Sequence, residues 1–415
     1  MAVELFPIQL LILVVIMNRY VLGWFFKLSL RGRFDRTDEL LEPTVAFVIP
    51  LFNEGEGIYR TILSLLEQDY PPQKLEVVVV DDCSSDDSFA WACKAAEGRR
   101  NVTVLRNTKN VGKRRGLIRA VRQTSAEIVV SVDSDVTVDR KALRHLVARF
   151  VDPDIAAVGG RTFVRGCQAS WLTRMIEVKF YFSQEWLKDL ERSFRSVMCL
   201  SGCLTAYRRA VLLELESILE ARRVLGVPIL YGEDRFLTRQ IVKAGYKTVF
   251  TPLAICHTAA PAKLQAYFSQ QLRWRRSNLV DMISALSHVW RLHPVIAFHL
   301  LSLFALAVAY PVAVFNMLLN GNLWEMMTAH LSFAAVLGLV YAFKMRGIPP
   351  EQRVSAVSFL PIVLVLPVTY ILFTPLALFT LDSGSWETRG SAAGASGGDR
   401  VSTPEAGAIA EPEET

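Results

Sequence analysis

Two aspartates, Asp133 and Asp135, follow a hydrophobic run and are separated by a single serine. Two carboxylates at this spacing can approach one divalent cation, and a hard ion such as Mg²⁺ or Mn²⁺ can then bridge them to a diphosphate. Their position at the end of a predicted strand favours this metal site. Aspartates in such positions also cap turns and helices, so the spacing leaves both roles open.

Polar clusters also follow two earlier hydrophobic runs. Pro50, Asn53 and Glu54 come after the first run, and Asp82 comes after the second. The Asp82 carboxylate could accept a hydrogen bond from the N3–H of uracil, or it could start a turn. Lys113, which follows Asn-Val-Gly, could neutralise a phosphate or begin a solvated helix.

The string Gly232-Glu233-Asp234-Arg235 follows a polar break and precedes a helical pattern. A displacement in which a hydroxyl group attacks in line needs a carboxylate to remove the hydroxyl proton. Asp234 is the candidate for this base. Its alternative role is a helix N-cap, with Arg235 as a surface partner.

A third set of candidates lies in the string Gln270-Gln271-Leu272-Arg273-Trp274. On a helix, Gln270, Arg273 and Trp274 are three and four residues apart and therefore share one face. Arginine suits a diphosphate leaving group through bidentate contacts, and tryptophan offers a flat apolar surface for a sugar ring. Arginine and tryptophan beside a membrane also serve as interfacial anchors, so this alternative stays open.

Short Val/Ile-rich runs that alternate with helical patterns must position these side chains. The runs are 44–50, 75–81, 101–106 and 127–133, and the helices lie near 57–68, 86–97 and 113–124. Near-continuous apolar runs between helices predict a parallel sheet buried on both faces. Ligands bind at the carboxyl ends of such strands, which is where the polar clusters lie. We therefore predict an α/β domain over residues 40–285.

Apolar residues concentrate at both ends of this domain. Residues 5–30 can form one transmembrane helix, and the basic residues that follow it predict a signal-anchor over 1–35 with the next segment in the cytosol. Apolar stretches at 294–319, 323–343 and 355–381 predict a membrane region over 290–382. Because the third stretch contains three prolines, we expect two crossings and a broken, partly interfacial segment. Within 383–415, the part from residue 390 has the composition of a disordered tail.

The composition limits the classes of function. The chain has 415 residues, of which 52% are hydrophobic, and this is too apolar for an ordinary soluble enzyme of its size. Its net charge of +6 arises from basic residues beside the apolar spans, which indicates membrane orientation and not nucleic-acid binding. The six cysteines show no CxxC pattern, so we expect reduced thiols on the cytosolic side.

Taken in order, these strings resemble the membrane β-glycan synthases of glycosyltransferase family 2. These include hyaluronan synthases, rhizobial chitin-oligosaccharide synthases and the pneumococcal type 3 capsule synthase. The resemblance runs from about Val45 to Met282 and resumes at Ser383–Arg389. Besides Pro50, Asn53 and Glu54, it rests on the strings VDDCS (80–84), NVGKR (110–114), DSD (133–135), WLTR (171–174), SGCLTAYRR (201–209), GEDR (232–235) and QQLRW (270–274).

The resemblance implies a GT-A fold with a Rossmann-like parallel core, and it implies roles for individual residues. The implied metal ligands for Mg²⁺ or Mn²⁺ are Asp133 and Asp135. The implied nucleotide-sugar contacts are Pro50, Asn53, Glu54, Asp82, Lys113, Asp133, Arg273, Trp386 and Arg389. The implied acceptor contacts are Ser201, Gly202, Cys203, Tyr207, Arg208 and Trp274. The implied catalytic residues are Asp234, Gln270, Arg273 and Trp274.

Two positions depart from the family pattern. Cys203 stands where the family usually has proline, and Glu387 stands where it has glycine. Ser383–Arg389 is similar to the family's gating loop, in which Trp386 and Arg389 would close over the nucleotide. A carboxylate at Glu387 would oppose that closure electrostatically, because the nucleotide carries a diphosphate.

The resemblance implies a processive, inverting glycosyltransferase in the plasma membrane, with a cytosolic catalytic domain. It would polymerise sugar from UDP donors, including UDP-GlcNAc, and extrude the glycan. Its partners would be the UDP-sugar, the growing glycan and membrane lipid, with no nucleic acid and no obligatory protein partner. One alternative is a non-processive transferase that acts on a lipid-linked acceptor. Another is an inactive transport subunit, against which the intact DSD, GEDR and QQLRW strings argue.

Overall fold

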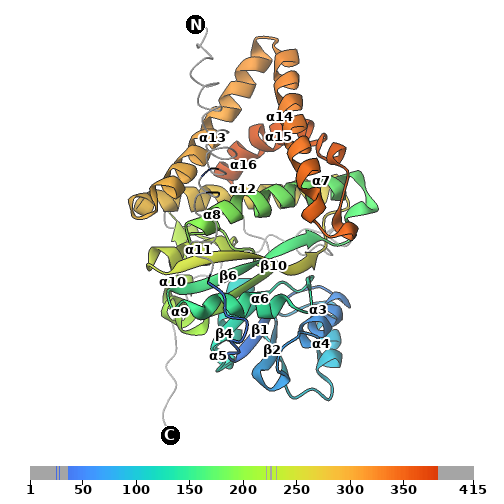
Figure 1. The fold of residues 1–415 in the computed structure, drawn as a ribbon, viewed down its shortest axis with the longest axis vertical. Helices are drawn as coiled ribbons and strands as arrows, with labels where there is room; N and C mark the ends of the chain where they lie inside the picture. The colour runs from blue at the N-terminus through green and yellow to red at the C-terminus, as the bar shows by residue number, and fades with distance from the viewer. Residues whose placement is uncertain are drawn as a thin grey trace.

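The computed structural model describes residues 36–220, 222–224, 227–229 and 231–381, together with positions 25 and 28. The predicted signal-anchor therefore lies almost entirely outside the described residues, and Trp386, Arg389 and the rest of 383–415 lie wholly outside them. The described part has three layers along its long axis: a sheet domain, a group of helices across it, and a helical hairpin at the far end (Figure 1).

The sheet domain is built on eight strands in the order β3-β2-β1-β4-β7-β6-β10-β5. The strands β3, β2, β1 and β4 run parallel, whereas β7 is antiparallel to both of its neighbours, β4 and β6. The bounds are β1 Val45–Leu51, β2 Leu75–Asp81, β3 Val102–Arg106, β4 Ile128–Val132, β5 Thr137–Val138, β6 Ile155–Val164, β7 Leu204–Arg208 and β10 Lys247–Thr258, and β8 Arg223–Val224 pairs with β9 Val227–Pro228 in a separate ribbon. The four predicted parallel strands correspond to β1–β4.

Helices cover both faces of the sheet, which explains why a central strand such as β1 is apolar and buried at every position. Phe47 and Ile49 of β1 pack on one face beside Ile62, and Val48 packs on the other face beside Leu117. The helices of this domain are α3 Gly57–Leu66, α4 Ser88–Ala96, α5 Lys113–Gln123, α6 Ala142–Val147, α9 Arg209–Glu214, α10 Glu216–Glu220 and α11 Glu233–Lys243. Short 3₁₀ turns occupy Pro72–Lys74, Ala148–Val151, Cys167–Ala169, Leu286–Arg291, Met345–Gly347, Pro350–Gln352 and Ala356–Phe359.

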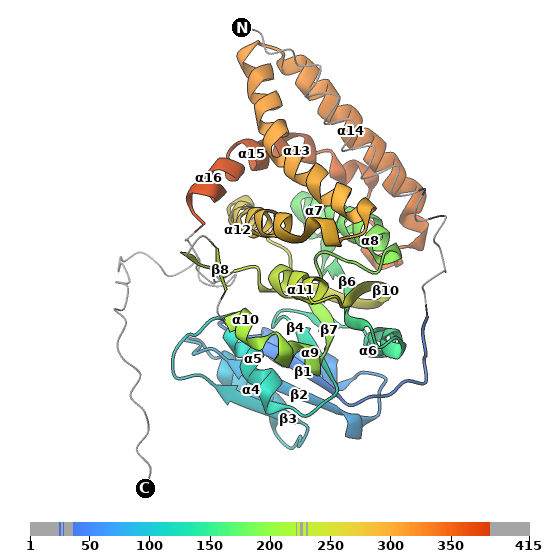
Figure 2. The same cartoon turned by 90° about the vertical axis from the view of Figure 1, so that its left-hand side faces the viewer.

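Two long helical segments lie between the sheet and the hairpin (Figure 2). One is α7 Trp171–Tyr181, which continues through a π-helical turn, Phe182–Lys188, into α8 Asp189–Ser193, and the other is α12 Leu264–Ala285. The sequence of α7 and of the turn after it carries an apolar stripe, formed by Trp171, Met175, Val178, Phe182 and Trp186, which predicts either a membrane-surface helix or simple packing. Met175 and Val178 are buried in one cluster with residues of the membrane segments, so packing is what the structure shows for them.

Three described segments are long and apolar enough to cross a membrane: Pro294–Leu319, Leu323–Gly347 and Ala356–Phe379. The first two contain α13 Pro294–Leu319 and α14 Leu323–Lys344, which form the hairpin. A helix of 26 residues such as α13 is about 39 Å long, which exceeds the hydrocarbon core of a bilayer. Large apolar side chains are exposed on both helices of the hairpin, for example Phe315 of α13 and Phe343 of α14, as lipid contact requires.

The third segment is broken into α15 Ile362–Ile371 and α16 Phe373–Phe379, and both of its ends lie against the sheet domain. At its start, Gln168 donates to the carbonyl of Arg353 at 2.5 Å. At its end, Tyr231 donates to the carbonyl of Leu381 at 2.9 Å. The two residues that flank this segment, Arg353 and Leu381, therefore both contact residues of the sheet domain.

The helices α11 and α12 are joined by two features. Arg239 of α11 forms a buried ion pair with Asp281 of α12 at 3.2 Å, with side-chain exposures of only 4% and 6%. Gly232, which precedes α11, has a φ of +66°, and a Cβ there would lie 2.0 Å from the Ser277 hydroxyl of α12. Gly232 therefore permits both the left-handed backbone and the close approach of the two helices.

We expect Gly232→Ala to destabilise the protein more than Gly245→Ala does. Gly245 also has a positive φ, +95°, but no atom of the described residues would lie within 4 Å of a Cβ at this position. Alanine at Gly245 should cost only the backbone strain, about 1–2 kcal/mol. Alanine at Gly232 should add an overpacking penalty of about 1–3 kcal/mol. Thermal unfolding of both variants in detergent measures the difference, and equal shifts would contradict the clash.

Candidate active site

A continuous cavity of about 1470 Å³ begins at the carboxyl ends of the parallel strands and extends between the membrane helices. Its lining includes most of the residues predicted as site residues. These are Pro50, Glu54, Lys113, Asp133, Asp135, Ser201, Gly202, Cys203, Asp234, Gln270, Arg273 and Trp274. Segments from β1, β4, β7, α5, α11 and α12 thus meet around one space, as the predicted topology requires.

The sheet end of the cavity is organised around the Lys113 ammonium group. Its Nζ lies 2.6 Å from Asp133 Oδ1 and 2.8 Å from Glu233 Oε1. Burial favours neutral lysine, but the two carboxylates outweigh it and raise the pKa of Lys113 well above its usual value. Lys113 is therefore a fixed cation that joins the DSD string to the GEDR string. The close approach also explains Gly202, where a Cβ would lie 3.0 Å from this ammonium.

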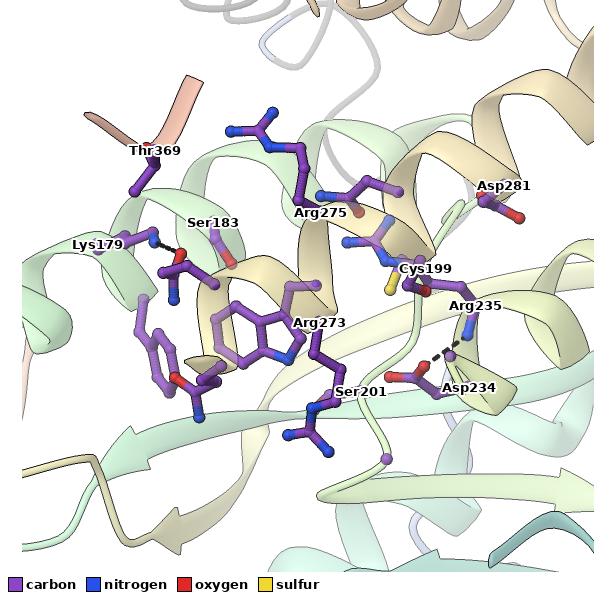
Figure 3. A pocket seen from close by; sticks show the side chains of 18 of the residues that line it. Lys179, Ser183, Cys199, Ser201, Asp234, Arg235, Arg273, Arg275, Asp281 and Thr369 are labelled. Atoms are coloured by element: carbon purple, nitrogen blue, oxygen red, sulfur yellow. Dashed lines mark hydrogen bonds between the residues drawn. The ribbon is translucent and has the colours of Figure 1, made fainter. Parts of the chain in front are cut away.

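Glu233 and Asp234 are neighbours with opposite electrostatics. Burial opposes ionisation of Glu233, but Lys113 outweighs this effect and lowers the pKa of Glu233 to about 2. Burial and the negative charge of Glu233 raise the pKa of Asp234. Its Oδ1 accepts a hydrogen bond of 2.8 Å from the backbone N–H of Arg235, which orients the carboxylate (Figure 3). A carboxylate with a raised pKa that faces a cavity suits proton abstraction.

Asp133 and Asp135 offer oxygen ligands that fit a hard divalent cation. Both line the cavity, and Thr258 donates to Asp135 Oδ2 at 3.1 Å. Among the described residues, no group of three or more His, Cys, Asp or Glu side chains could hold a metal ion. A cation here would therefore need further oxygen ligands from a bound phosphate and from water, which Mg²⁺ and Mn²⁺ accept readily.

The helix α12 carries three predicted site residues, Gln270, Arg273 and Trp274, into the cavity on one face. Arg273 extends toward Ser201 and the sheet, whereas Arg275 extends the opposite way, toward Thr369 (Figure 3). The indole of Trp274 lies beside Phe180, with ring centroids 6.5 Å apart. One helix thus presents a cation to the sheet end and an aromatic surface beside it.

Lys179 of α7 is a cavity residue that the sequence patterns did not single out. Its Nζ donates to Gln271 Oε1 at 2.5 Å and to the Tyr267 hydroxyl at 3.2 Å, and it lies 5.9 Å from the Trp274 ring centroid. Burial and the nearby Arg275 lower the pKa of Lys179 to about 7. The one signal for this residue in the sequence was that Lys179 lies outside the apolar stripe of α7.

Two predicted nucleotide contacts, Asp82 and Asn53, do not line the cavity. The buried Asp82 carboxylate accepts hydrogen bonds from the backbone N–H groups of Val111 and Gly112, at 2.9 and 2.7 Å, and a third from Asn107. It therefore supports the loop that lines the cavity, as a turn-forming aspartate does. Asn53 Oδ1 accepts from the backbone N–H of Ser85 at 2.9 Å. Glu54 does line the cavity.

The predicted acceptor segment divides into two parts. Ser201, Gly202 and Cys203 line the cavity, and burial raises the pKa of the Cys203 thiol well above its usual value, which keeps it protonated. Tyr207 is fully buried in the core of β7. Arg208 donates to the carbonyls of Phe150, Asp152 and Ile155. The structure thus gives Tyr207 a packing role and Arg208 a hydrogen-bonding role, both away from the cavity lining.

Comparison with known proteins follows this geometry. Residues 43–277, more than half of the chain, match the model of the family described as glycosyltransferase like family 2. An N-acetylglucosaminyltransferase of Rhizobium meliloti is 33% identical over 357 residues, which cover 84% of this chain and 82% of that protein. One from Rhizobium leguminosarum bv. viciae is 32% identical, with 85% and 82% covered.

A solved structure has the same fold. The mannosyltransferase PcManGT from Pyrobaculum calidifontis, in complex with GDP-Man and Mn²⁺, superposes with a TM-score of 0.58. The match covers 90% of this chain and 95% of that one at 22% identity. This likeness confirms the predicted GT-A type of fold with its parallel core. On sequence and fold together, the chain belongs to glycosyltransferase family 2.

Proposed function

We propose that this chain is a processive, inverting glycosyltransferase that transfers N-acetylglucosamine from UDP-GlcNAc to a growing β-linked glycan. The observation that carries the proposal is the single cavity, which joins the acidic sheet end, the α12 face and the space between the membrane helices. A donor, an acceptor end and an outgoing chain would each find a place in it. The names of the rhizobial relatives support GlcNAc as the transferred sugar.

The donor would bind at the sheet end of the cavity. Asp133 and Asp135 would hold a divalent cation, Mg²⁺ or Mn²⁺, which neutralises the donor diphosphate when bound. The GDP-Man and Mn²⁺ in the archaeal mannosyltransferase support this use of the fold. Glu54 and the loop at Val111–Gly112 would border the nucleotide, and Lys113 would add a positive charge beside the phosphates. Asp82 would act indirectly, by holding that loop.

The transfer itself would be a single displacement at C1 of the donor sugar. Asp234 takes the proton from the acceptor hydroxyl while the hydroxyl oxygen forms its bond to C1. The bond between C1 and the phosphate oxygen breaks, and its electron pair leaves with UDP. Inversion at C1 turns an α-linked donor into a β-linked product. Glu233 cannot compete as the base, because its ion pair with Lys113 holds it in place.

The α12 face would serve both the leaving group and the acceptor. The Arg273 guanidinium would stabilise the negative charge that develops on the departing diphosphate. The Trp274 indole would support the terminal sugar of the acceptor, because the C–H face of a pyranose is apolar. Gln270, together with Ser201, Gly202 and Cys203, would border that sugar.

The membrane part of the cavity would receive the growing chain. We place the sheet domain in the cytosol and the hairpin in the plasma membrane, which is supported by the charge pattern of the sequence. The third apolar segment would be re-entrant and would return residue 381 to the cytosolic side. The gating role of Trp386 and Arg389, which lie outside the described part of the chain, remains part of this proposal.

Incubation of the purified full chain in nanodiscs with radiolabelled UDP-GlcNAc tests this proposal. We expect a ladder of products on a gel and stoichiometric release of UDP. Excess EDTA should abolish both, and Mg²⁺ or Mn²⁺ should restore them, because the diphosphate needs a counter-charge. Asp135→Ala should lose donor binding together with activity. A ladder of normal length in excess EDTA would contradict the metal site.

The same gel separates the alternative functions. A single addition to a lipid-soluble product would indicate a non-processive transferase with a lipid-linked acceptor. One observation favours that second candidate: most side chains that line the membrane part of the cavity are apolar, among them Leu303, Leu306 and Phe333. No product with any UDP-sugar would indicate an inactive transport subunit.

A further inference from the structure

The membrane part of the cavity contains four side chains with polar groups that form a connected series. Arg275 of α12 lies over the ring of Tyr370 of α15, with its guanidinium carbon 3.8 Å from the ring centroid. Tyr370 meets Tyr310 of α13 edge to face, with centroids 5.0 Å apart. The Tyr310 hydroxyl is hydrogen-bonded to Nε2 of His330 of α14. All four residues line the cavity.

The partners of His330 determine the direction of this hydrogen bond. Its Nδ1 lies 2.6 Å from the backbone carbonyl of Met326, which can only accept, so Nδ1 carries a proton. In the neutral ring, Nε2 is then an acceptor, and Tyr310 donates its hydroxyl proton to it. The bond joins α13 to α14, so it is a bridge between the two helices of the hairpin.

The Tyr310–His330 bridge lies within the length of the cavity and not at its end. Lining residues continue beyond it on both helices: Met317 is seven residues past Tyr310 on α13, and Met326 is one turn before His330 on α14. Lining residues Leu300 and Leu303 lie on the other side of it, toward the sheet domain. A chain that moved outward from Trp274 along α13 and α14 would therefore reach this bridge before it reached Met317.

Polar side chains within a membrane segment are costly and generally serve a function. A hydroxyl, an imidazole, a guanidinium and two aromatic faces match a polyhydroxylated chain, because sugar rings present hydroxyl groups at their edges and apolar C–H faces. They do not match an acyl chain, which would be served by the apolar lining alone. The series begins at Arg275, the residue after Trp274, so the helix α12 carries both the proposed acceptor surface and the start of this series.

We propose that Tyr310, His330 and Tyr370, reached through Arg275, form a glycan-binding constriction in which the Tyr310–His330 bridge must open for the chain to pass. This inference rests on the proposed function and adds a site to it. The glycan stacks on Tyr370 and Tyr310, and its hydroxyl groups replace the bridge as hydrogen-bond partners. The constriction acts as a checkpoint: a chain whose passage is delayed there is released at a shorter length.

Product length in nanodiscs tests the constriction. Tyr310→Phe and His330→Phe each remove the bridge and keep an aromatic ring. The readout is the number of product chains longer than the most abundant wild-type size, divided by the number of chains at or below that size. We expect this ratio to rise about fivefold in each variant, because this factor corresponds to the free energy of one ordinary hydrogen bond. The double variant should show the same increase and not its square, because both substitutions remove one shared interaction.

Phe315→Ala is the matched control, because Phe315 is on the same helix but is exposed on the outer surface. It should leave the ladder unchanged. The ratio compares sizes within one lane, so it does not depend on the specific activity of each variant. An unchanged ladder in both single variants overturns the constriction and would favour an acyl chain in the cavity. Failure of the proposed function has a different signature, since the wild type would then give no ladder.

Discussion

Asp234→Asn is expected to transfer sugar at least ~100-fold more slowly than the wild type while it still binds UDP, because general-base catalysis contributes about 10²–10⁴-fold. Asparagine keeps the size of the side chain and the acceptor oxygen for the Arg235 N–H, but it cannot take a proton. Calorimetric UDP binding and the rate of UDP release, measured on the same preparation, separate loss of chemistry from loss of binding.

Glu233→Gln is the control, since it alters the neighbouring carboxylate in the same helical turn. Its effect should be milder and should include weaker donor binding, because the Lys113 ion pair is lost. A greater loss of turnover with Glu233→Gln than with Asp234→Asn would show that the base has been assigned to the wrong residue.

The same assignment predicts the pH dependence of the wild type. A base works only when it is deprotonated, so the rate should fall as the pH drops through the pKa of Asp234. Burial and Glu233 raise that pKa, so the acidic limb should lie above the pH expected for an ordinary aspartate. An acidic limb at the ordinary aspartate value would contradict the environment described for this residue.

Arg273→Ala is expected to reduce turnover by about 100- to 1000-fold, the range for removal of one preorganised group that stabilises developing charge. The physical reason is that the departing diphosphate would lose a cation that the helix α12 holds in place. The rate of UDP release at saturating UDP-GlcNAc measures this loss.

Arg276→Ala removes a guanidinium from the same helix but outside the cavity lining, where Arg276 donates to the Thr380 hydroxyl at 2.9 Å. It controls for changes in helix stability and in net charge, and its effect should be much smaller. Equal losses in the two variants would indicate that Arg273 acts only as a structural anchor of α12.

The sequence predicted the bounds of the parallel strands closely, because a run of apolar residues and the polar residues that end it are local features of the sequence. The observed β1 and β2 agree with the predicted runs to within about one residue. The antiparallel strand β7 was not predicted, although its residues lie in the recognised string 201–209. In a strand buried on both faces, alternation does not show which side chains face a ligand. Tyr207 and Arg208 were assigned to the acceptor because the string 201–209 resembles the family's acceptor segment, and the structure places neither of them in the cavity lining.

Most of the site residues that local motifs identified do line the cavity, but the motifs did not show the contacts between them. Lys113 and Glu233 are 120 positions apart, and no sequence period reports that the fold brings them to 2.8 Å. Lys179 was missed for a similar reason, because its partner Gln271 is on another helix. The role of Asp82 depends on a loop conformation that its own string does not specify.

The buried Arg239–Asp281 pair and the contact of Gly232 with Ser277 have a mechanical consequence. They fasten the helix that carries Asp234 to the helix that carries Arg273 and Trp274, and removing one partner of such a pair costs about 3–5 kcal/mol. Asp234, the proposed base, and Trp274, the proposed support of the acceptor sugar, should therefore move as one rigid body. After each addition, the proposed reaction must place a new terminal hydroxyl at the same point. We infer that the glycan advances by one sugar past the helices α11 and α12, and that these two helices stay in place during each addition.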